Sequence, residues 1–504
     1  MRRNTILAFD LALVVLLLSW QSGPAQSLNE FEKRLTEFKL ENGLTVLIFE
    51  RHTAPVVSFV THANVGSVDE HLGITGIAHI FEHMAFKGTS TIGTKDYVKE
   101  KAAMAKVDSI FALIRKEKLK RARADTALIH RLEKAMQKAQ EEADKYVDHD
   151  AFDRIIEQAG GVGMNAMTSQ DATRYFYSLP SNKIELWMYL ESGRFRDPVL
   201  REFFREKNVV LEEYRLGKNN PIRRIVEDVA AMAYKAHPYG RPVIGFKSDI
   251  EMITRSQALD FFKKHYTANN LTVAIVGDVD PKQARALAQK YFGRLPAGPE
   301  PEPVITVEPK QEGERRFTLE APAQPFVIMT FHRPSVNHPD DPVFSVMEDI
   351  LGRGRTSRLY RSLVKDKKIA VQASVFSGLT GDKYPGLITF YAFPAKDHTN
   401  QECEKAILDE IERIKSEPVT EEELQKAKDR ARVDLVREMQ SNQGLAMTLA
   451  YYQVITGDWR NLFRDLDAVQ RVTAEDVQRV ARTYLTRQNR TVGYLQPRSS
   501  ESAN

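Results

Sequence analysis

Short segments of alternating apolar and polar residues open each half of the chain, and segments with helical spacing follow them. The extended segments are residues 45–49, 56–60 and 326–331, which are rich in Val, Ile, Phe and Thr, as strands require. Apolar residues recur at three- and four-residue steps in residues 343–351 and 421–439, which predicts helices. The pattern predicts the α+β fold class, with mixed or antiparallel β-sheets flanked by helices set to one side.

The end of each half repeats one order of elements at a constant offset of 219 residues. Thr254 and Thr473 each open a helical pattern, which leads to Asn270 in the first half and to Asn489 in the second. A strand pattern follows each asparagine. This order predicts a duplication and therefore two homologous domains.

A proline-rich stretch separates the two halves. Residues 296–303 read Pro-Ala-Gly-Pro-Glu-Pro-Glu-Pro, which can neither continue a helix nor pair as a central strand. We therefore predict a first domain at residues 26–295, a linker at 296–314 and a second domain at 315–498.

One long stretch of the first half, from residue 94 to 159, contains neither glycine nor proline. An apolar stripe recurs in it at helical steps, made of Leu128, Leu132, Met136, Ala139, Ala143 and Tyr146. The stripe predicts a long amphipathic helix or a helical hairpin. Such an arm can be a solvated element that packs one stripe on its neighbour, or a site where a partner docks.

The composition is that of a globular protein of two or three domains. Of the 504 residues, 42% are hydrophobic and 28% are charged, which fits neither a disordered chain nor a membrane-embedded body. The 72 Lys and Arg residues nearly balance the 68 Asp and Glu residues, so no nucleic-acid partner is expected. Because Cys403 is the only cysteine, an intramolecular disulfide and a cysteine-cluster metal site are both excluded.

The N-terminus resembles a signal peptide. A basic start precedes an apolar run at residues 11–18, and the small residues Gly23 and Ala25 follow it, as at a leader cleavage site. We predict a leader at residues 1–25 and an exported protein, periplasmic or secreted. The apolar run is too short to span a bilayer, so no stable membrane anchor is expected. The alternative is a buried N-terminal helix.

The candidate chemistry is concentrated in the sequence His79-Ile-Phe-Glu82-His83. On a helix, residues four apart lie on one face, so both imidazoles can reach one ion. Zinc favours nitrogen ligands and lowers the pKa of a water, whose proton a carboxylate such as Glu82 can accept. These residue types and this spacing fit metal-assisted amide hydrolysis. The alternative is two surface histidines beside a glutamate that forms salt bridges.

The third ligand is expected to be a carboxylate on a different helix. Glu206 and Glu213 are seven residues apart, so they share one face of a helix. Glu212 points about 100° away from Glu213. Spacing alone does not distinguish a ligand-bearing face from an ordinary acidic helix surface.

The order His-x-x-Glu-His, the inverse of His-Glu-x-x-His, marks the inverzincins. With it, the chain resembles the M16 family of metallopeptidases, which includes pitrilysin, insulin-degrading enzyme and the mitochondrial processing peptidase. The resemblance covers nearly the whole chain after the leader. Its further motifs are Phe86-Lys-Gly-Thr89, Gly160-Gly161, Asn165-Ala166-Met-Thr168, Asp171-Ala-Thr173, residues 206–213, His237-Pro-Tyr239, Pro242-Val-Ile-Gly245, Tyr266-Thr-Ala-Asn-Asn270, Gly277-Asp278 and Ser357-Arg-Leu359.

The resemblance implies a role for each residue of the motif. His79, His83 and Glu213 would hold one Zn²⁺ per chain, with Glu82 as the general base. Glu206 would be an outer carboxylate that supports the site.

The resemblance also implies a mode of substrate binding. The two domains of such a chain form half of a clamshell chamber, which admits only short or unfolded polypeptides. Asn165 and Ala166 match the edge strand of the family, onto which a peptide substrate adds as an extra strand through backbone pairing.

The chain departs from the family pattern between its metal motifs. Between His83 and Glu213 lie 129 residues, where the family has roughly 75. The excess falls on the glycine- and proline-free stretch, and we predict an inserted helical arm at about residues 101–147.

A second departure concerns an Arg and a Tyr that many active members carry after Ser-Arg-Leu to stabilise the oxyanion. Val364 and Val371 occupy those positions, and valine donates no hydrogen bond. A second M16-like chain can supply the pair in a heterodimer; the alternative is a self-sufficient homodimer. The second domain contains no His-x-x-Glu-His and is predicted to bind no metal.

The sequence therefore predicts a zinc-dependent endopeptidase that acts on peptides or unfolded segments as the zinc-bearing subunit of a heterodimer. One alternative is a non-catalytic M16-like subunit with an assembly or scaffolding role. Another is zinc storage or sensing, for which the chain carries no motif of its own.

Overall fold

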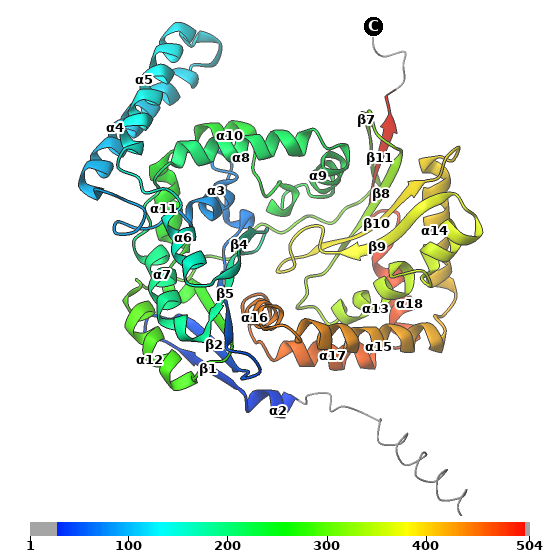
Figure 1. Cartoon of the computed structure of the whole chain (residues 1–504). Coiled ribbons are helices and arrows are strands. Elements are labelled where there is room, and N and C mark those ends of the chain that lie inside the picture. The colour runs from blue at the N-terminus through cyan, green and yellow to red at the C-terminus, as the bar shows by residue number, and fades with distance from the viewer. Residues whose placement is uncertain (1–27, 499–504) are drawn as a thin grey trace, which may run out of the picture.

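Two β-sheets, one in each half of the chain, form the framework of the computed structural model, which describes residues 28–498 (Figure 1). The predicted leader, residues 1–25, lies outside the described residues. The strands of the first sheet are β1 (Leu35–Lys39), β2 (Thr45–Glu50), β3 (Val56–Ala63), β4 (Val162–Thr168), β5 (Thr173–Pro180) and β6 (Leu271–Gly277). Their order is β1-β2-β6-β3-β5-β4, and only the pairing of β2 with β6 is parallel among them.

The second sheet repeats the topology of the first. Its strands are β7 (Arg315–Ala321), β8 (Phe326–Arg333), β9 (Ala370–Ser377), β10 (Gly386–Pro394) and β11 (Arg490–Pro497), in the order β7-β11-β8-β10-β9. As in the first sheet, the first strand of the five runs parallel to the last, and the other pairs are antiparallel. Without β1, the two orders are the same, which confirms the predicted α+β fold of two related halves.

Helices surround both sheets. Those of the first half are α2 (Leu28–Glu32), α3 (Ile77–Met84), α4 (Tyr97–Lys118), α5 (Thr126–Asp144), α6 (Ala151–Gln158), α7 (Ile184–Arg196), α8 (Phe203–Lys218), α9 (Pro221–Ala233), α10 (Lys247–Met252), α11 (Arg255–His265) and α12 (Pro281–Tyr291). Those of the second half are α13 (Asp341–Gly352), α14 (Asn400–Ser416), α15 (Glu421–Glu438), α16 (Asn442–Tyr451), α17 (Asn461–Arg471) and α18 (Ala474–Tyr484), with π-helices η7 (Tyr360–Asp366) and η8 (Tyr452–Thr456).

The matched positions of the repeat make matched contacts. Thr254 and Thr473 each cap a helix, α11 and α18, through a capping box. The side-chain amide of Asn270 donates to a carbonyl five residues earlier at 2.7 Å, and that of Asn489 does the same at 2.8 Å. Each asparagine therefore closes the turn between helix and strand, which explains why the residue recurs at this offset.

One helix from each half of the chain packs on the sheet of the other half. On β2, Val46 and Ile48 face the core of the first half, whereas Leu47 and Phe49 belong to a cluster with Leu445 of α16. Because both faces of β2 are buried, residues 46–49 form a continuous apolar run. The alternation of apolar and polar residues expected for this segment is therefore wrong. The sequence pattern predicts helices on one side of each sheet. The structure instead has helices on both faces of the first sheet.

The second sheet shows the reciprocal arrangement. On β8, Val327 and Met329 face the core of the second half, whereas Phe326 and Ile328 cluster with Val229 of α9. Helix α9 belongs to the first half and packs on β8 and β11. The two halves are thus joined by buried apolar surface on both sheets.

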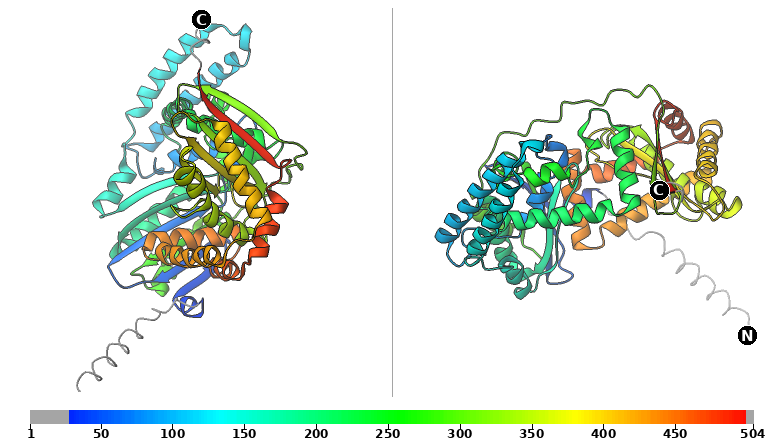
Figure 2. Two further views of the ribbon diagram at one scale, coloured as in Figure 1. Left: turned by 90° about the vertical axis from the view of Figure 1, so that its right-hand side faces the viewer. Right: turned by 90° about the horizontal axis from the view of Figure 1, so that it is seen from above.

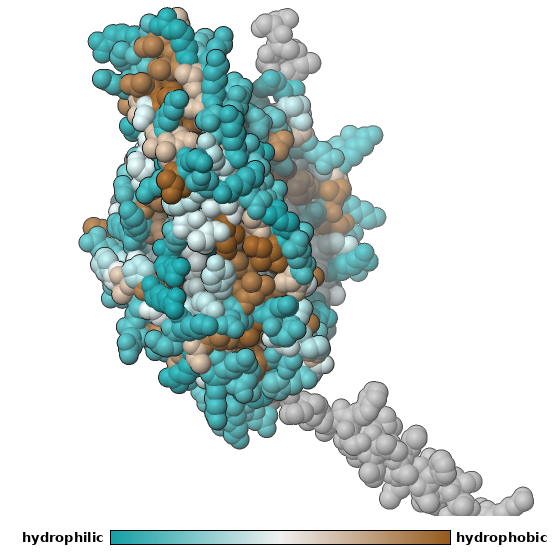
Figure 3. Space-filling view, turned by 60° about the vertical axis from the view of Figure 1, so that its left-hand side comes forward, coloured by the Kyte–Doolittle hydropathy of each residue, from teal (hydrophilic) through white to brown (hydrophobic). Residues whose placement is uncertain are grey.

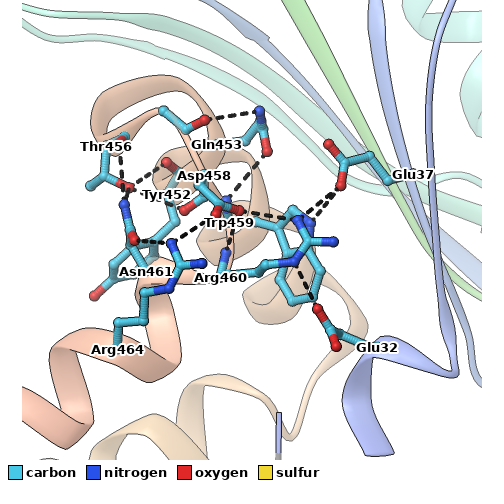
Figure 4. A network of polar contacts seen from close by, with 11 residues as sticks. Glu32, Glu37, Tyr452, Gln453, Thr456, Asp458, Trp459, Arg460, Asn461 and Arg464 are labelled. Carbon is cyan, nitrogen blue, oxygen red and sulfur yellow. Dashed lines mark hydrogen bonds and ion pairs between the residues drawn. The ribbon is translucent and has the colours of Figure 1, made fainter. Parts of the chain in front are cut away.

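A polar network joins the N-terminal segment to the second half (Figure 4). Arg460 donates to Glu32 at 2.7 Å and to Glu37 at 3.2 Å. The indole N–H of Trp459, which is buried, also donates to Glu37, at 3.0 Å. Residues more than 400 positions apart in the chain are therefore held side by side, at the edge of the first sheet.

Helices α4 and α5 form an antiparallel hairpin that projects from the first half (Figure 1). Of the two alternatives for the glycine- and proline-free stretch, a long helix or a helical hairpin, the structure has the hairpin. At its root, the backbone N–H of Lys95 donates to the carbonyl of Tyr146 at 2.7 Å. Further along α4, Asp108 forms an ion pair with Arg255 of α11. We call this hairpin, residues 97–144, the arm.

Residues 296–314 contain no helix or strand and run across one face of the molecule between the halves (Figure 2). The linker boundaries stay predictions, although the absence of regular structure agrees with them. Within residues 28–498, no helix has both the length and the apolar character that crossing a membrane requires.

Candidate metal centre

Helix α3 carries the histidines and is fixed by its surroundings at its start. Gly76 precedes it with φ +89°, a left-handed conformation that favours glycine. The buried carboxylate of Glu70 accepts the backbone N–H of Gly76 at 2.8 Å and that of Ala78 at 2.9 Å. It therefore satisfies amides at the helix N-terminus that would otherwise lack partners. Ile80 and Phe81 are buried, so the helix can present only its histidine face to the site.

The structure brings the two histidines of α3 together with one carboxylate of α8. Nε2 of His79 lies 3.5 Å from Oε2 of Glu213, and Nε2 of His83 lies 3.9 Å from the same oxygen. The centroids of the two imidazole rings are 5.0 Å apart, and the ring planes are nearly perpendicular. One nitrogen or oxygen from each of the three residues lies within 4.8 Å of the others. This spacing fits three ligands around one ion.

Helix α8 presents both sequence-predicted carboxylates, Glu206 and Glu213, to α3. Glu212 instead points to solvent, where it pairs with Arg215. The helix is fixed from behind by Lys207, whose buried ammonium donates to the carbonyls of Glu251 at 3.1 Å and Ile253 at 2.7 Å. Burial lowers the pKa of Lys207 to about 7.

Glu206 supports the site from behind His83. Oε2 of Glu206 lies 3.5 Å from Nδ1 of His83, so the other ring nitrogen of His83, Nε2, faces Glu213. The ammonium of Lys87 lies 2.7 Å from the second oxygen of Glu206 and 3.2 Å from Glu202. A carboxylate that contacts the far nitrogen of a histidine fixes the orientation of the ring. Lys87 in turn fixes that carboxylate.

Burial and charge set the protonation of this cluster. Burial, with the neighbouring His83 and Arg223, lowers the pKa of His79 to about 4, which keeps its imidazole neutral, the form that binds metals. Burial opposes ionisation of Glu206, but contacts with His83 and Lys87 outweigh it and lower its pKa to about 2. Glu206 is therefore ionised at neutral pH, between His83 and the ammonium of Lys87.

Glu82 lies on α3 beside His83 and is held by the edge strand of the sheet. Burial raises the pKa of Glu82, and a hydrogen bond from the Thr168 hydroxyl at 2.5 Å opposes that rise. Thr168 is the last residue of β4. Glu82, the candidate general base, is therefore hydrogen-bonded to β4, the edge strand that is predicted to pair with substrate.

Replacing Thr168 with valine is expected to lower the turnover number about tenfold and to leave the metal content unchanged, because a hydrogen bond to a charged carboxylate contributes about 1.5 kcal/mol. Thr168→Ser keeps the hydroxyl and is expected to restore most of the rate. The measurement is kcat and KM for a fluorogenic peptide, together with zinc per chain. Equal loss in both variants would show that the hydroxyl alone does not account for the effect.

The other sequence-predicted positions lie on β4, η7 and β9. Asn165 and Ala166 lie on β4, where Asn165 is exposed and Ala166 is buried. Strand β4 is an edge strand, paired on one side with β5. Val364 lies on η7 and packs against the core of the second half, whereas Val371 lies on β9 and is 62% exposed.

Sequence reasoning gave no role to Lys87, Thr168 or Glu202. Lys87 and Thr168 stand inside motifs of the family resemblance, but their partners, Glu206 and Glu82, are more than 80 residues away in the chain. Glu202 had no signal in the sequence. Its φ of +57° is a left-handed conformation just before α8, which places its carboxylate within reach of Lys87.

Two protein-family models match the chain. The model for insulinase (peptidase family M16) matches residues 45–111 and 129–247, and the model for the peptidase M16 inactive domain matches residues 252–431. The stretch left out between the two parts of the first match, residues 112–128, covers the outer end of the arm.

The chain is also similar to named proteases along most of its length. It is 28% identical over 476 residues to zinc protease PqqE of Helicobacter pylori, a match that covers 91% of this chain and 92% of that protein. It is 26% identical over 445 residues to a zinc protease of Mycobacterium tuberculosis, covering 86% of each.

Solved structures share the fold. A crystal structure of a protease from Helicobacter pylori superposes with a TM-score of 0.75 at 26% identity, and covers 92% of this chain and 99% of that one. The periplasmic protease PqqL from Escherichia coli superposes with a TM-score of 0.69 at 18% identity, and this chain spans 48% of its length.

Proposed function

Because the chain belongs to the insulinase family of M16 peptidases, we propose that it is a zinc-dependent endopeptidase that hydrolyses peptides or unfolded polypeptide segments. The observation that carries the proposal is the cluster of His79, His83 and Glu213, with the carboxylate of Glu82 on the same helix as the histidines. Its relatives are named zinc proteases.

The donor set of the cluster fits zinc. Two imidazole nitrogens and one carboxylate oxygen are a ligand set of catalytic zinc sites, which keep a further position open. We propose that His79, His83 and Glu213 hold one Zn²⁺ per chain, which when bound would act as a Lewis acid toward the scissile carbonyl. Glu82 would accept a proton from the attacking water and pass it to the leaving amine.

The edge strand β4 supports the proposed choice of substrate. A peptide that pairs with the free edge of β4 near Asn165 and Ala166 would be recognised through its backbone. Thr168, at the end of that strand, holds Glu82, so a peptide paired along β4 would lead toward the base. Selection would depend on an extended conformation rather than on a particular side chain.

Removing the metal is expected to abolish peptidase activity without unfolding the chain, since apolar cores hold α3 and α8 in place. A chelator should lower the rate at least a hundredfold, and stoichiometric Zn²⁺ should restore it. The test is peptide cleavage and zinc content of the same sample before and after chelation. His79→Ala should lose the zinc, whereas His130→Ala, an exposed histidine on α5, should keep it. Activity that survives complete metal removal would contradict the proposed function.

We also propose that a second M16-like chain completes the site in a heterodimer. Val364 and Val371 donate no hydrogen bond at the positions where the family places an Arg and a Tyr, and loss of one oxyanion donor costs about 10²–10³ in rate. A related chain that carries the pair but no zinc motif is expected to raise the turnover number by that factor when mixed with this chain. A homodimer that is fully active alone would contradict the heterodimer.

The same two valines favour a second candidate, a non-catalytic M16-like subunit with an assembly role. This candidate predicts zinc binding without cleavage, whether alone or with a partner chain. Export to the periplasm or beyond remains part of the proposal and is supported by the leader pattern at residues 1–25.

A further inference from the structure

The outer end of the arm carries a segment rich in positive charge. Residues 116–123, which we call the arm tip, include the end of α4 and the turn before α5. Just before the tip, Arg115 of α4 donates to the carbonyl of Met252 in the body of the first half at 3.1 Å. The arm tip follows Arg115 in the chain, at the end of the arm that projects away from the rest of the molecule (Figures 1 and 2).

The net charge of the whole chain is concentrated in the arm tip. Five basic residues and one acidic residue lie there, which leaves 67 basic and 67 acidic residues in the rest of the 504-residue chain. Lys118 and Lys120 have acidic partners within 2.8 Å. Lys116, Arg121 and Arg123 form no ion pair with any residue in the range 28–498. Three cations are therefore free for an external anion.

An apolar side chain stands among these charges. Leu119 is 56% exposed at the point where α4 turns toward α5. Figure 3 shows apolar side chains along the middle of the arm, bordered by hydrophilic ones. The tip also falls within residues 112–128, which the family model leaves unmatched. The peptidase fold therefore does not account for this combination of residues.

We propose that the arm tip adsorbs to the surface of a bilayer that contains anionic lipids. A cluster of four to eight basic residues is the sequence feature that anionic headgroups attract. The tip is the convex end of a hairpin, and mobile headgroups can gather around cations that point in different directions. Leu119 can enter the boundary between headgroups and acyl chains, as apolar residues of interfacial helices do. Such adsorption is reversible and needs no membrane-spanning helix.

Ion pairs at the root of the arm would fix the position of the metal centre relative to the adsorbed tip. The buried ion pair of Glu100 with Arg201, at 2.7 Å, fastens α4 to the segment just before α8. Asp108 and Arg255 fasten it a second time, to α11. Adsorption at the tip would therefore hold the metal centre at a fixed distance from the lipid surface.

The test is co-sedimentation of the processed chain, without its apolar leader, with vesicles. Binding is expected to vesicles that contain 30% phosphatidylglycerol, and not to pure phosphatidylcholine vesicles, and to fall as salt screens the charges. The variant Lys116→Gln/Arg121→Gln/Arg123→Gln should bind roughly a hundredfold more weakly, since each basic residue near such a surface contributes about fivefold. Leu119→Ser should weaken binding several-fold.

The matched control removes three exposed lysines elsewhere on the first half, Lys39→Gln/Lys263→Gln/Lys282→Gln, and should bind as the unaltered chain does. Peptidase activity and melting temperature of both triple variants show that the fold is intact. Equal losses in the two triple variants, or no binding to phosphatidylglycerol vesicles, would overturn the proposal. Tip-dependent binding to polyglutamate without binding to vesicles would assign the tip to an acidic protein and would also overturn it.

Discussion

Replacing Glu82 with glutamine is expected to lower the turnover number about a thousandfold and to leave one zinc per chain in place. A positioned general base typically contributes 10²–10⁴ in rate. Glutamine has nearly the shape of glutamate and can still accept the Thr168 hydroxyl, which lies 2.5 Å from the carboxylate. It cannot take up a proton. The variant therefore removes the proposed chemistry while it preserves the packing of α3.

The matched control for this experiment is Glu212→Gln. Glu212 lies one residue from the proposed ligand Glu213, but its carboxylate is exposed and pairs with Arg215. Its replacement should change the rate by less than about twofold. The measurement is kcat, KM and zinc content of both variants and of the unaltered chain, each with and without a partner chain. Turnover that does not depend on Glu82 in any of these samples would favour the non-catalytic alternative.

Replacing Arg201 with methionine is expected to produce the largest loss of stability, about 3–5 kcal/mol in the free energy of unfolding. The guanidinium is buried and pairs with the fully buried carboxylate of Glu100 at 2.7 Å. It also donates to the carbonyls of Ile92 at 2.9 Å and Thr89 at 2.7 Å. Methionine would leave the buried charge of Glu100 without a partner and would remove one donor from each of the two carbonyls, although that of Ile92 keeps the backbone N–H of Thr89. The stranded charge explains the size of the effect.

Arg205→Met provides the comparison, since the Arg205 side chain is exposed and its partner Glu202, at 2.9 Å, also pairs with Lys87. A pair whose cation is exposed contributes at most about 1 kcal/mol. Thermal unfolding of both variants, at matched zinc content, measures the difference. Adding Glu100→Gln to Arg201→Met removes the stranded charge and should recover part of the loss. Similar melting temperatures for the two single variants would contradict the role given to Arg201.

Part of the candidate site could be predicted from the sequence, because it depends on local geometry. His79 and His83 are four apart on one helix, and Glu206 and Glu213 are seven apart on another. The helical period alone places each pair on one face. That the two faces meet depended on the family resemblance, and the structure now places the side chains within 3.9 Å.

The contacts that support the site could not be predicted in this way. Lys87 and Glu202 are 115 residues apart, and Glu82 and Thr168 are 86 apart. Such pairs depend on how the sheet, the helices and the loops between them pack, and no periodic pattern records that. The sequence also did not predict that α9 and α16 each pack on the sheet of the other half, for the same reason. Each helix is amphipathic or apolar in its own segment, and the sequence does not show which sheet will cover it.

The packing of α16 on the sheet of the first half also affects the order in which the chain can fold during synthesis. The outer face of the first sheet stays open to water until α16, which begins at residue 442, has left the ribosome. Contacts this far apart in sequence form slowly, because a long loop must close before they form. The nascent chain therefore stays incompletely folded until it is almost complete. If the chain is exported, as the leader pattern predicts, that delay would keep it unfolded enough to pass through a translocation channel.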